Sequence, residues 1–217
     1  MNQVYFGTIE SYTDLGLMLS EVETGTPEPK RTVIEVPGMN GVLDPTRHIH
    51  QDMFYQNRNI RLTFAMANYQ NQWMELFSGI TSKIHGRYYQ VRIEPDQDYY
   101  WDAFCTVDTE KSDKNKGIVI VSLDAFPFKR KMEETSYDVI ASSVGRSQIC
   151  MNSRMKVVPS FYASDSGISV SFGDVVHELT AAIEMTFPDI MFAEGENEIL
   201  VTGTAGTVTV TYREGSL

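Results

Sequence analysis

Alternating apolar and polar positions are the main pattern of the first half of the chain, and they predict β-strands. In the segment NIRLTFAM, Ile60, Leu62, Phe64 and Met66 fall on one side of an extended chain, because successive side chains of a strand point to opposite faces. The same alternation recurs in YYQVRIE and WDAFCTV. The segment GIVIVSL is apolar on both faces, which favours a central strand.

One segment has a helical period instead. In NYQNQWMELFSGITSKIHG the apolar residues recur every three or four positions, which predicts an amphipathic helix at about residues 70 to 85. Asn68 or Asn71 can cap its start, and Gly86 can end it in a left-handed conformation. The side chains expected to anchor this helix on the sheet of its own domain are Trp73, Phe77, Ile80 and Ile84.

A domain boundary is predicted after Pro127, where the alternation gives way to a mixed charge cluster from Lys129 to Glu134. Residues 1–130 are expected to form a β-barrel-like domain with the one helix. Residues 131–217 contain strand-like segments at the spacing of about 8–12 residues that is typical of a β-sandwich or jelly roll. The expected fold class is therefore mainly β, in two domains.

The end of the chain, EILVTGTAGTVTVTYREG, is interpreted as a β-hairpin around a glycine-containing turn. Val208, Val210 and Tyr212 would then lie on one face of its second strand, and the threonines between them on the other.

Charge and composition narrow the classes of function. The formal net charge is -11 and the pI is near 4.8, so the field of the protein repels phosphate backbones, and no sequence-specific nucleic-acid partner is expected. The longest apolar run is far short of the roughly 20 residues of a membrane helix, and no signal-peptide pattern opens the chain. We expect synthesis and folding in a cytoplasm, no membrane partner, and buried free thiols at Cys105 and Cys150.

Two segments are candidates for chemistry. In RHIHQD, His48, His50 and Asp52 would share one face of a strand, as a metal site on a sheet requires. A further ligand and its supporting partners are missing from the sequence, so we interpret this segment as a solvated or interface strand face without a metal. In EPDQDYYWD, acidic and aromatic residues lie together, as they would at a glycosidase or sugar site, but a hairpin tip explains them equally well.

Motifs of known enzyme classes are missing from the sequence. It contains no G-x-S-x-G, no glycine-rich phosphate loop, no H-E-x-x-H and no C-x-x-C. The protein is therefore not expected to be an enzyme, and no cofactor is expected.

Several segments resemble, in order and spacing, the N-terminal domain of siphophage distal tail proteins, the Dit family. They are YFGTIESYTDLGLML, VPGMNGVLD, YQNRNIRLTF and IHGRYYQVRIEPDQDYYW. The terminal stretch GENEILVTGTAGTVTVTYREGSL is similar to the end of the galectin-like C-terminal domain of the same family. The resemblance covers almost the whole chain. The chain differs from the family pattern at Trp101, Asp102 and Ala103.

The segment VPGMNGVLD is interpreted as a bend rather than a ligand-binding loop. A strand would end at Pro37, Gly38 and Gly41 would supply backbone conformations that other residues avoid, and Asp44 would cap the next turn. The resemblance implies that this bend contributes to a ring between subunits.

The resemblance implies a structural role at the tip of a phage or prophage tail. Similar proteins form a hexameric ring that joins the tail tube to the tail-associated host-facing protein, with DNA passing through the lumen. Two alternatives remain open. A carbohydrate-binding module for a host surface glycan would need an exposed aromatic platform, for which Phe161, Tyr162 and Phe172 are available. A glycoside hydrolase would need two carboxylates facing each other across a groove.

Overall fold

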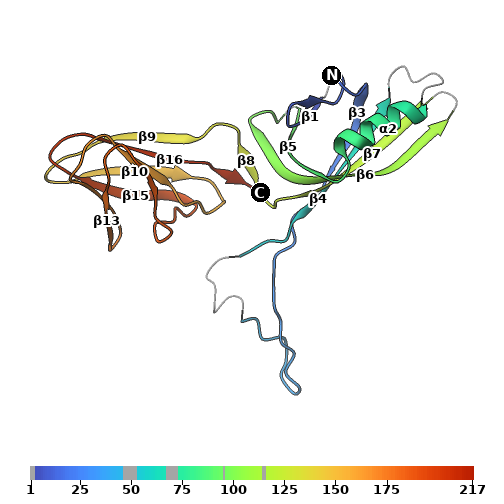
Figure 1. Cartoon of the computed structure of the whole chain (residues 1–217). Coiled ribbons are helices and arrows are strands. Elements are labelled where there is room, and N and C mark those ends of the chain that lie inside the picture. The colour runs from blue at the N-terminus through green and yellow to red at the C-terminus, as the bar shows by residue number, and fades with distance from the viewer. Residues whose placement is uncertain (1–2, 46–52, 67–72, 95, 114–115) are drawn as a thin grey trace. The chain divides into compact units, whose positions relative to one another are not determined.

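The structure is a computed structural model that describes residues 3–45, 53–66, 73–94, 96–113 and 116–217 (Figure 1). It is mainly β, and its described part contains one helix. The chain divides into two compact units, Met1–Pro127 and Phe128–Leu217. The division falls three residues before the boundary that the sequence predicts at residue 130.

The first unit is built on one antiparallel arrangement of strands. In space their order is β2-β1-β5-β6-β7-β4-β3. Along the chain they are β1 (Val4–Phe6), β2 (Ile9–Glu10), β3 (Leu17–Thr24), β4 (Arg58–Met66), β5 (Arg87–Ile93), β6 (Tyr99–Asp113) and β7 (Lys116–Ala125).

The alternation predicted for β4 is confirmed. Ile60, Leu62, Phe64 and Met66 are buried in the core of the first unit. Strand β7, predicted to be central because it is apolar on both faces, pairs with β6 on one side and β4 on the other. The period of the sequence therefore identified both the strands and the face that each one buries.

The helix α2 (Trp73–Ile84) lies within the predicted range and packs on the core of its own unit. Ile80 and Ile84 are buried, while Trp73 and Phe77 are partly buried against the same cluster. The proposed caps Asn68 and Asn71 lie outside the described residues. No helix in the described part of the chain is long and apolar enough to cross a membrane.

Gly86 directly follows the last turn of α2. It has a φ of 73°, the left-handed conformation expected after a helix end. Its N–H donates to the carbonyl of Cys105 at 2.8 Å, so the helix end is joined by a hydrogen bond to β6.

The start of α2 meets β7 at a glycine. A Cβ placed on Gly117 would lie 2.2 Å from the Trp73 ring and 3.2 Å from the Cβ of Met66. We expect Gly117→Ala to lower the free energy of unfolding of the first unit by about 1–3 kcal/mol, because a rigid ring has to move. Urea unfolding followed by tryptophan fluorescence measures this, since both tryptophans, Trp73 and Trp101, lie in the first unit.

The matched control is Gly79→Ala, on an exposed position of α2 with nothing within 4 Å of the added Cβ. This substitution should stabilise the unit by about 0.5–1 kcal/mol, because glycine weakens a helix relative to alanine. Equal effects of the two substitutions would contradict the close packing of α2 on β7.

The two cysteines are free and buried, as predicted, one in each unit. Burial raises the pKa of Cys105 to about 12 and that of Cys150 to about 11. Because the thiolate is the reactive form, we expect neither thiol to react with a disulfide reagent at pH 8 in the native protein, and both to react in denaturant. A fast native reaction at either thiol would show that its unit is not closed around it.

The second unit is a sandwich of two sheets. The β15 sheet has the order β10-β15-β12-β13, and the β16 sheet has the order β14-β11-β16-β9. Between them lies a core that includes Phe161, Phe192 and Val201. The strands are β8 (Lys129–Lys131), β9 (Thr135–Ile140), β10 (Arg146–Asn152), β11 (Ser160–Ala163), β12 (Ile168–Phe172), β13 (Val175–Leu179), β14 (Glu184–Thr186), β15 (Gly195–Thr202), β16 (Thr207–Tyr212) and β17 (Gly215–Ser216).

The predicted hairpin at the end of the chain is wrong. Strand β15 pairs with β10 and β12, whereas β16 pairs with β9 and β11, so the two strands lie in opposite sheets. The predicted inward face of β16 is correct, since Val208 and Val210 are buried. Both strands contribute alternate apolar residues to one core, and the period alone cannot tell whether neighbouring strands share a sheet or face each other.

Candidate assembly surfaces

Between β3 and β4 the chain forms an arm, consisting of residues 25–45 and 53–57 among those described. Its two segments are joined by backbone hydrogen bonds from Lys30 to Phe54 at 2.7 Å and from Gln56 to Glu28 at 2.8 Å. Further along, Ile34 and Leu43 form an isolated antiparallel bridge. The arm is thus a ribbon of paired backbone segments that is joined to the sheet at one end, through β3 and β4.

The arm exposes a series of large apolar side chains. Their exposed fractions lie between 39% and 53%. A two-stranded ribbon has no second layer to cover such side chains and is only marginally stable by itself. The arm is therefore an apolar surface suited to contact with another molecule. Its exposed apolar residues are Val33, Ile34, Val36, Met39, Val42, Leu43, Met53 and Phe54.

The bend predicted from VPGMNGVLD lies at the turn of this arm. Gly38 and Gly41 have φ values of 84° and 82°, and an added Cβ on either would meet nothing within 4 Å. Glycine is therefore favoured at both positions because of the positive φ, and not because another group packs closely against the backbone. The prediction that a strand ends at Pro37 is wrong. The residues before Pro37 form a single bridge, between Ile34 and Leu43, which is too short to be a strand.

Asp44 is part of an ion pair within the arm. Its carboxylate accepts hydrogen bonds from Nε and Nη2 of Arg31, at 3.0 and 2.8 Å. The sequence predicted Asp44 as a capping residue. The structure places its carboxylate against Arg31, so the ion pair joins the two sides of the turn that contains Gly38 and Gly41.

The acidic segment after β5 is a hairpin tip. The Glu94 carboxylate accepts hydrogen bonds from the backbone N–H of Gln3 at 3.1 Å and from the side chain of Gln97 at 3.0 Å. Trp101 is buried and lines a recess of about 370 Å³ beside this tip. Sugar stacking needs an exposed ring, and Trp101 does not offer one.

The other candidate residues do not form a reactive site in the described part of the chain. His48, His50 and Asp52 lie outside the described residues. Among the described residues, no group of three or more His, Cys, Asp or Glu side chains is placed to hold a metal ion.

The aromatic platform required for a carbohydrate-binding module is not formed by its three candidates. Phe161 is fully buried, and Phe172 packs against the core of the sandwich. Tyr162 is 44% exposed. A single tyrosine is a small surface compared with the stacked rings that sugar recognition favours.

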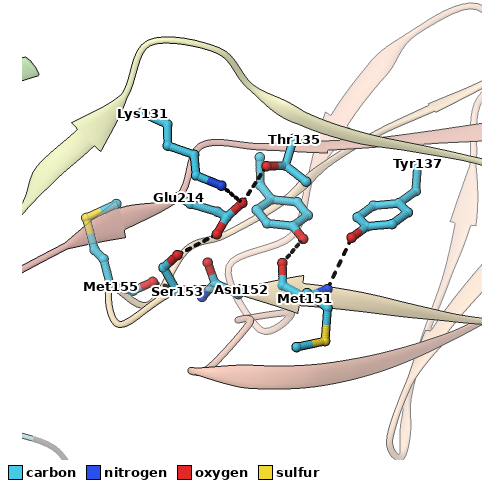
Figure 2. Close-up of polar contacts among 9 residues, drawn as sticks. Lys131, Thr135, Tyr137, Met151, Asn152, Ser153, Met155 and Glu214 are labelled. Atoms are coloured by element: carbon cyan, nitrogen blue, oxygen red, sulfur yellow. Dashed lines mark hydrogen bonds and ion pairs between the residues drawn. The ribbon is translucent and has the colours of Figure 1, made fainter. Parts of the chain in front are cut away.

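A polar cluster that the sequence did not predict closes the second unit. Glu214 is only 8% exposed. Figure 2 shows its carboxylate accepting hydrogen bonds from Lys131 Nζ at 2.6 Å, from Thr135 Oγ1 at 2.7 Å and from Ser153. Beside it the hydroxyl of Tyr212 donates to the carbonyl of Met151. The cluster joins the last strands of the chain to the first strands of the second unit.

The charge of Glu214 is set by competing effects. Burial raises its pKa, but hydrogen bonds from Lys131, Ser153 and Thr135 outweigh this, so the pKa lies below its ordinary value. The neighbouring Arg213 donates to the carbonyl of Lys131 and to Glu134. The sequence offered one indication of this cluster, the complementary charges of two segments. The mixed charges from Lys129 to Glu134 are complementary to those of Arg213 and Glu214, which lie some 80 residues away.

With two β-rich units and an apolar arm, the chain has the fold of a phage tail hub protein. One solved structure to which it is similar is that of the SPP1 Dit (gp 19.1) protein, described as a paradigm of the hub adsorption apparatus in phages that infect Gram-positive bacteria. The two structures agree with a TM-score of 0.74 over 100% of both chains, at 12% sequence identity. No protein-family model matches the chain, and no curated protein matches it.

Proposed function

We propose that this chain is a structural hub of a phage or prophage tail tip, forming a ring that connects the tail tube to the host-facing tail protein. The observation that carries the proposal is the full-length similarity to the SPP1 hub protein, at a TM-score of 0.74. At 12% identity this similarity concerns the fold. The role in the tail therefore needs support from the surfaces of this chain itself.

The arm supports self-association. Its apolar side chains are left about half exposed by the described residues of their own unit, and fully burying one such side chain contributes about 1.5–3 kcal/mol. The partner that fits the proposal is a second copy, bound head to tail, because a heterologous contact closes into a ring when the rotation between copies divides the circle. A ring of six copies is the arrangement that the resemblance to the Dit family implies.

The charge supports the passage of DNA. The chain has 29 acidic residues against 18 basic ones, and a lumen with a surplus of carboxylates repels the phosphate backbone, so DNA would move through without binding. In this proposal the protein has no catalytic activity and needs no cofactor, because its work is to hold other proteins in place. A carbohydrate-binding role is less favoured, since Phe161 and Phe172 are not available for stacking.

Immunogold labelling of purified phage or prophage particles with an antibody against this chain tests the proposed location. We expect one cluster of gold at the distal end of each tail. Labelling along the whole tube, or particles whose mass spectra contain no peptide of this chain, would contradict the proposed function.

A further inference from the structure

The two outer faces of the sandwich differ in chemistry. The outward positions of β16, the central strand of its sheet, are Thr207, Thr209 and Thr211, and Thr209 donates a hydrogen bond to Asp138 of β9. Such a face of hydroxyl groups is typical of a sheet surface in water. The outer face of the β15 sheet carries more large apolar side chains, four against the two, Ile140 and Tyr162, that lie beside the threonines on the β16 sheet.

Four apolar residues lie on this outer face. Ile149 and Met151 are 48% and 50% exposed, Leu200 is 40% exposed and Val176 is 62% exposed. The strand register brings them together: Leu200 lies opposite Ser147 of β10 and Ser171 of β12, and Ser171 lies opposite Val176 of β13. The four residues therefore belong to one surface that crosses the sheet.

Glutamates lie among these apolar side chains. Met151 lies opposite Glu196 and Ile149 lies opposite Glu198, and a third carboxylate, Glu178, lies one row further along, opposite Ser169. None of the three glutamates has an ion-pair partner among the described residues.

Cations and aromatic rings are missing from the outward positions of these four strands. Arg146, at the start of β10, is in register with Gln148 and Cys150 and therefore belongs to the other face of the strand. The surface is therefore a mixture of apolar side chains and carboxylates, with Glu196 and Glu198 on the inner strand β15 and Ile149 and Met151 beside them on the edge strand β10.

We propose that this outer face of the β15 sheet is a docking surface for another tail protein, whose contact surface combines apolar side chains with lysine or arginine. The proposal rests on the proposed function. Carboxylates that form no ion pair and lie beside apolar side chains favour a partner of opposite charge. They disfavour nucleic acid and anionic membranes, and the missing aromatic rings disfavour a sugar.

A second copy of this chain is a poorer fit. If the same face of two copies met around a two-fold axis, Glu196 and Glu198 of one copy would approach those of the other. Such contacts between like charges weaken an interface unless cations intervene. The partner we infer is therefore a different protein of the assembly.

Carboxyl labelling and cross-linking with a water-soluble carbodiimide test the proposal. The reagent activates a carboxylate, and a lysine amine in contact with it then forms an amide with loss of the activating group as a urea. Intact tails and the isolated chain are treated in parallel with a small added amine, and the products are read by mass spectrometry. Asp138, on the outer face of the β16 sheet, is the internal control.

We expect Glu178, Glu196 and Glu198 to be labelled in the isolated chain and protected at least about fivefold in tails, with an amide link from one of them to a lysine of a different protein. Asp138 should be labelled in both samples. Equal labelling of the glutamates in tails that contain the chain would overturn the docking surface alone, and so would links only to lysines of a second copy. Tails without the chain would overturn the proposed function, and the docking surface with it.

Charge reversal gives a second readout. Glu196→Lys with Glu198→Lys should prevent incorporation of the partner found by cross-linking, whereas Asp138→Lys should leave it unchanged. Both variants should keep Cys150 protected from thiol reagents, which shows that the sandwich has folded. Normal incorporation of the partner into tails built with the double variant would overturn the proposal.

Discussion

Replacing Val36 and Val42 with aspartate is expected to abolish ring formation while both units stay folded. The two side chains are exposed, at 41% and 48%, and lie on the arm, so the substitutions remove no core contact. In a ring they would bury charge without a partner, which costs several kcal/mol at an interface. The affinity between copies should therefore fall by at least about 100-fold.

Sedimentation velocity and electron microscopy of the assembled sample measure this effect. The control is Ile140→Asp, which likewise places a carboxylate at an exposed apolar residue, here on β9 in the second unit. It should leave ring formation intact. Rings formed equally well by the arm variant would show that the arm is not the contact between copies.

Replacing Glu214 with alanine is expected to destabilise the second unit by about 2–4 kcal/mol, because Lys131, Thr135 and Ser153 lose their common acceptor. The buried thiols report each unit separately, since Cys150 lies in the second and Cys105 in the first. Reaction of Cys150 through transient opening should become roughly 30- to 1000-fold faster, while Cys105 should be unaffected. Unchanged reactivity of Cys150 would contradict the role of this cluster.

The same glutamate predicts a dependence of stability on pH. Because the folded state lowers its pKa, its ionised form stabilises the fold at neutral pH, and this contribution is lost as the pH falls below about 4.5, the ordinary value, through the lowered pKa. Glu214→Gln should remove this part of the acid sensitivity of the second unit. Measuring Cys150 reactivity from pH 7 down to pH 3, with correction for the thiolate fraction, distinguishes the two proteins.

Much of the fold could be predicted from local patterns. The alternation of β4 gave the correct buried face because Ile60, Leu62, Phe64 and Met66 all face the core. The helical spacing of Trp73, Phe77, Ile80 and Ile84 likewise predicted α2 on its sheet. In both cases the period of the side chains within one element carries the information.

Features that depend on contacts between distant segments could not be predicted in this way. The period of β15 and β16 is the same whether they form a hairpin or face each other across a core. Glu214 and Lys131 are 83 residues apart, and no local pattern pairs them. The bend at Gly38 and Gly41 was recognised, but the exposure of the arm depends on the pairing of distant residues such as Lys30 and Phe54, which no local pattern indicates.

The central claim is that copies of this chain form the ring of a tail hub. Single-particle electron microscopy of the chain mixed with the neighbouring tail proteins tests it most directly. The account predicts a closed ring, six copies in the arrangement that the resemblance implies, with the arm of each copy against the next and a surplus of Asp and Glu around the lumen. A stable complex without a ring, or a lumen lined with lysine and arginine, would contradict it.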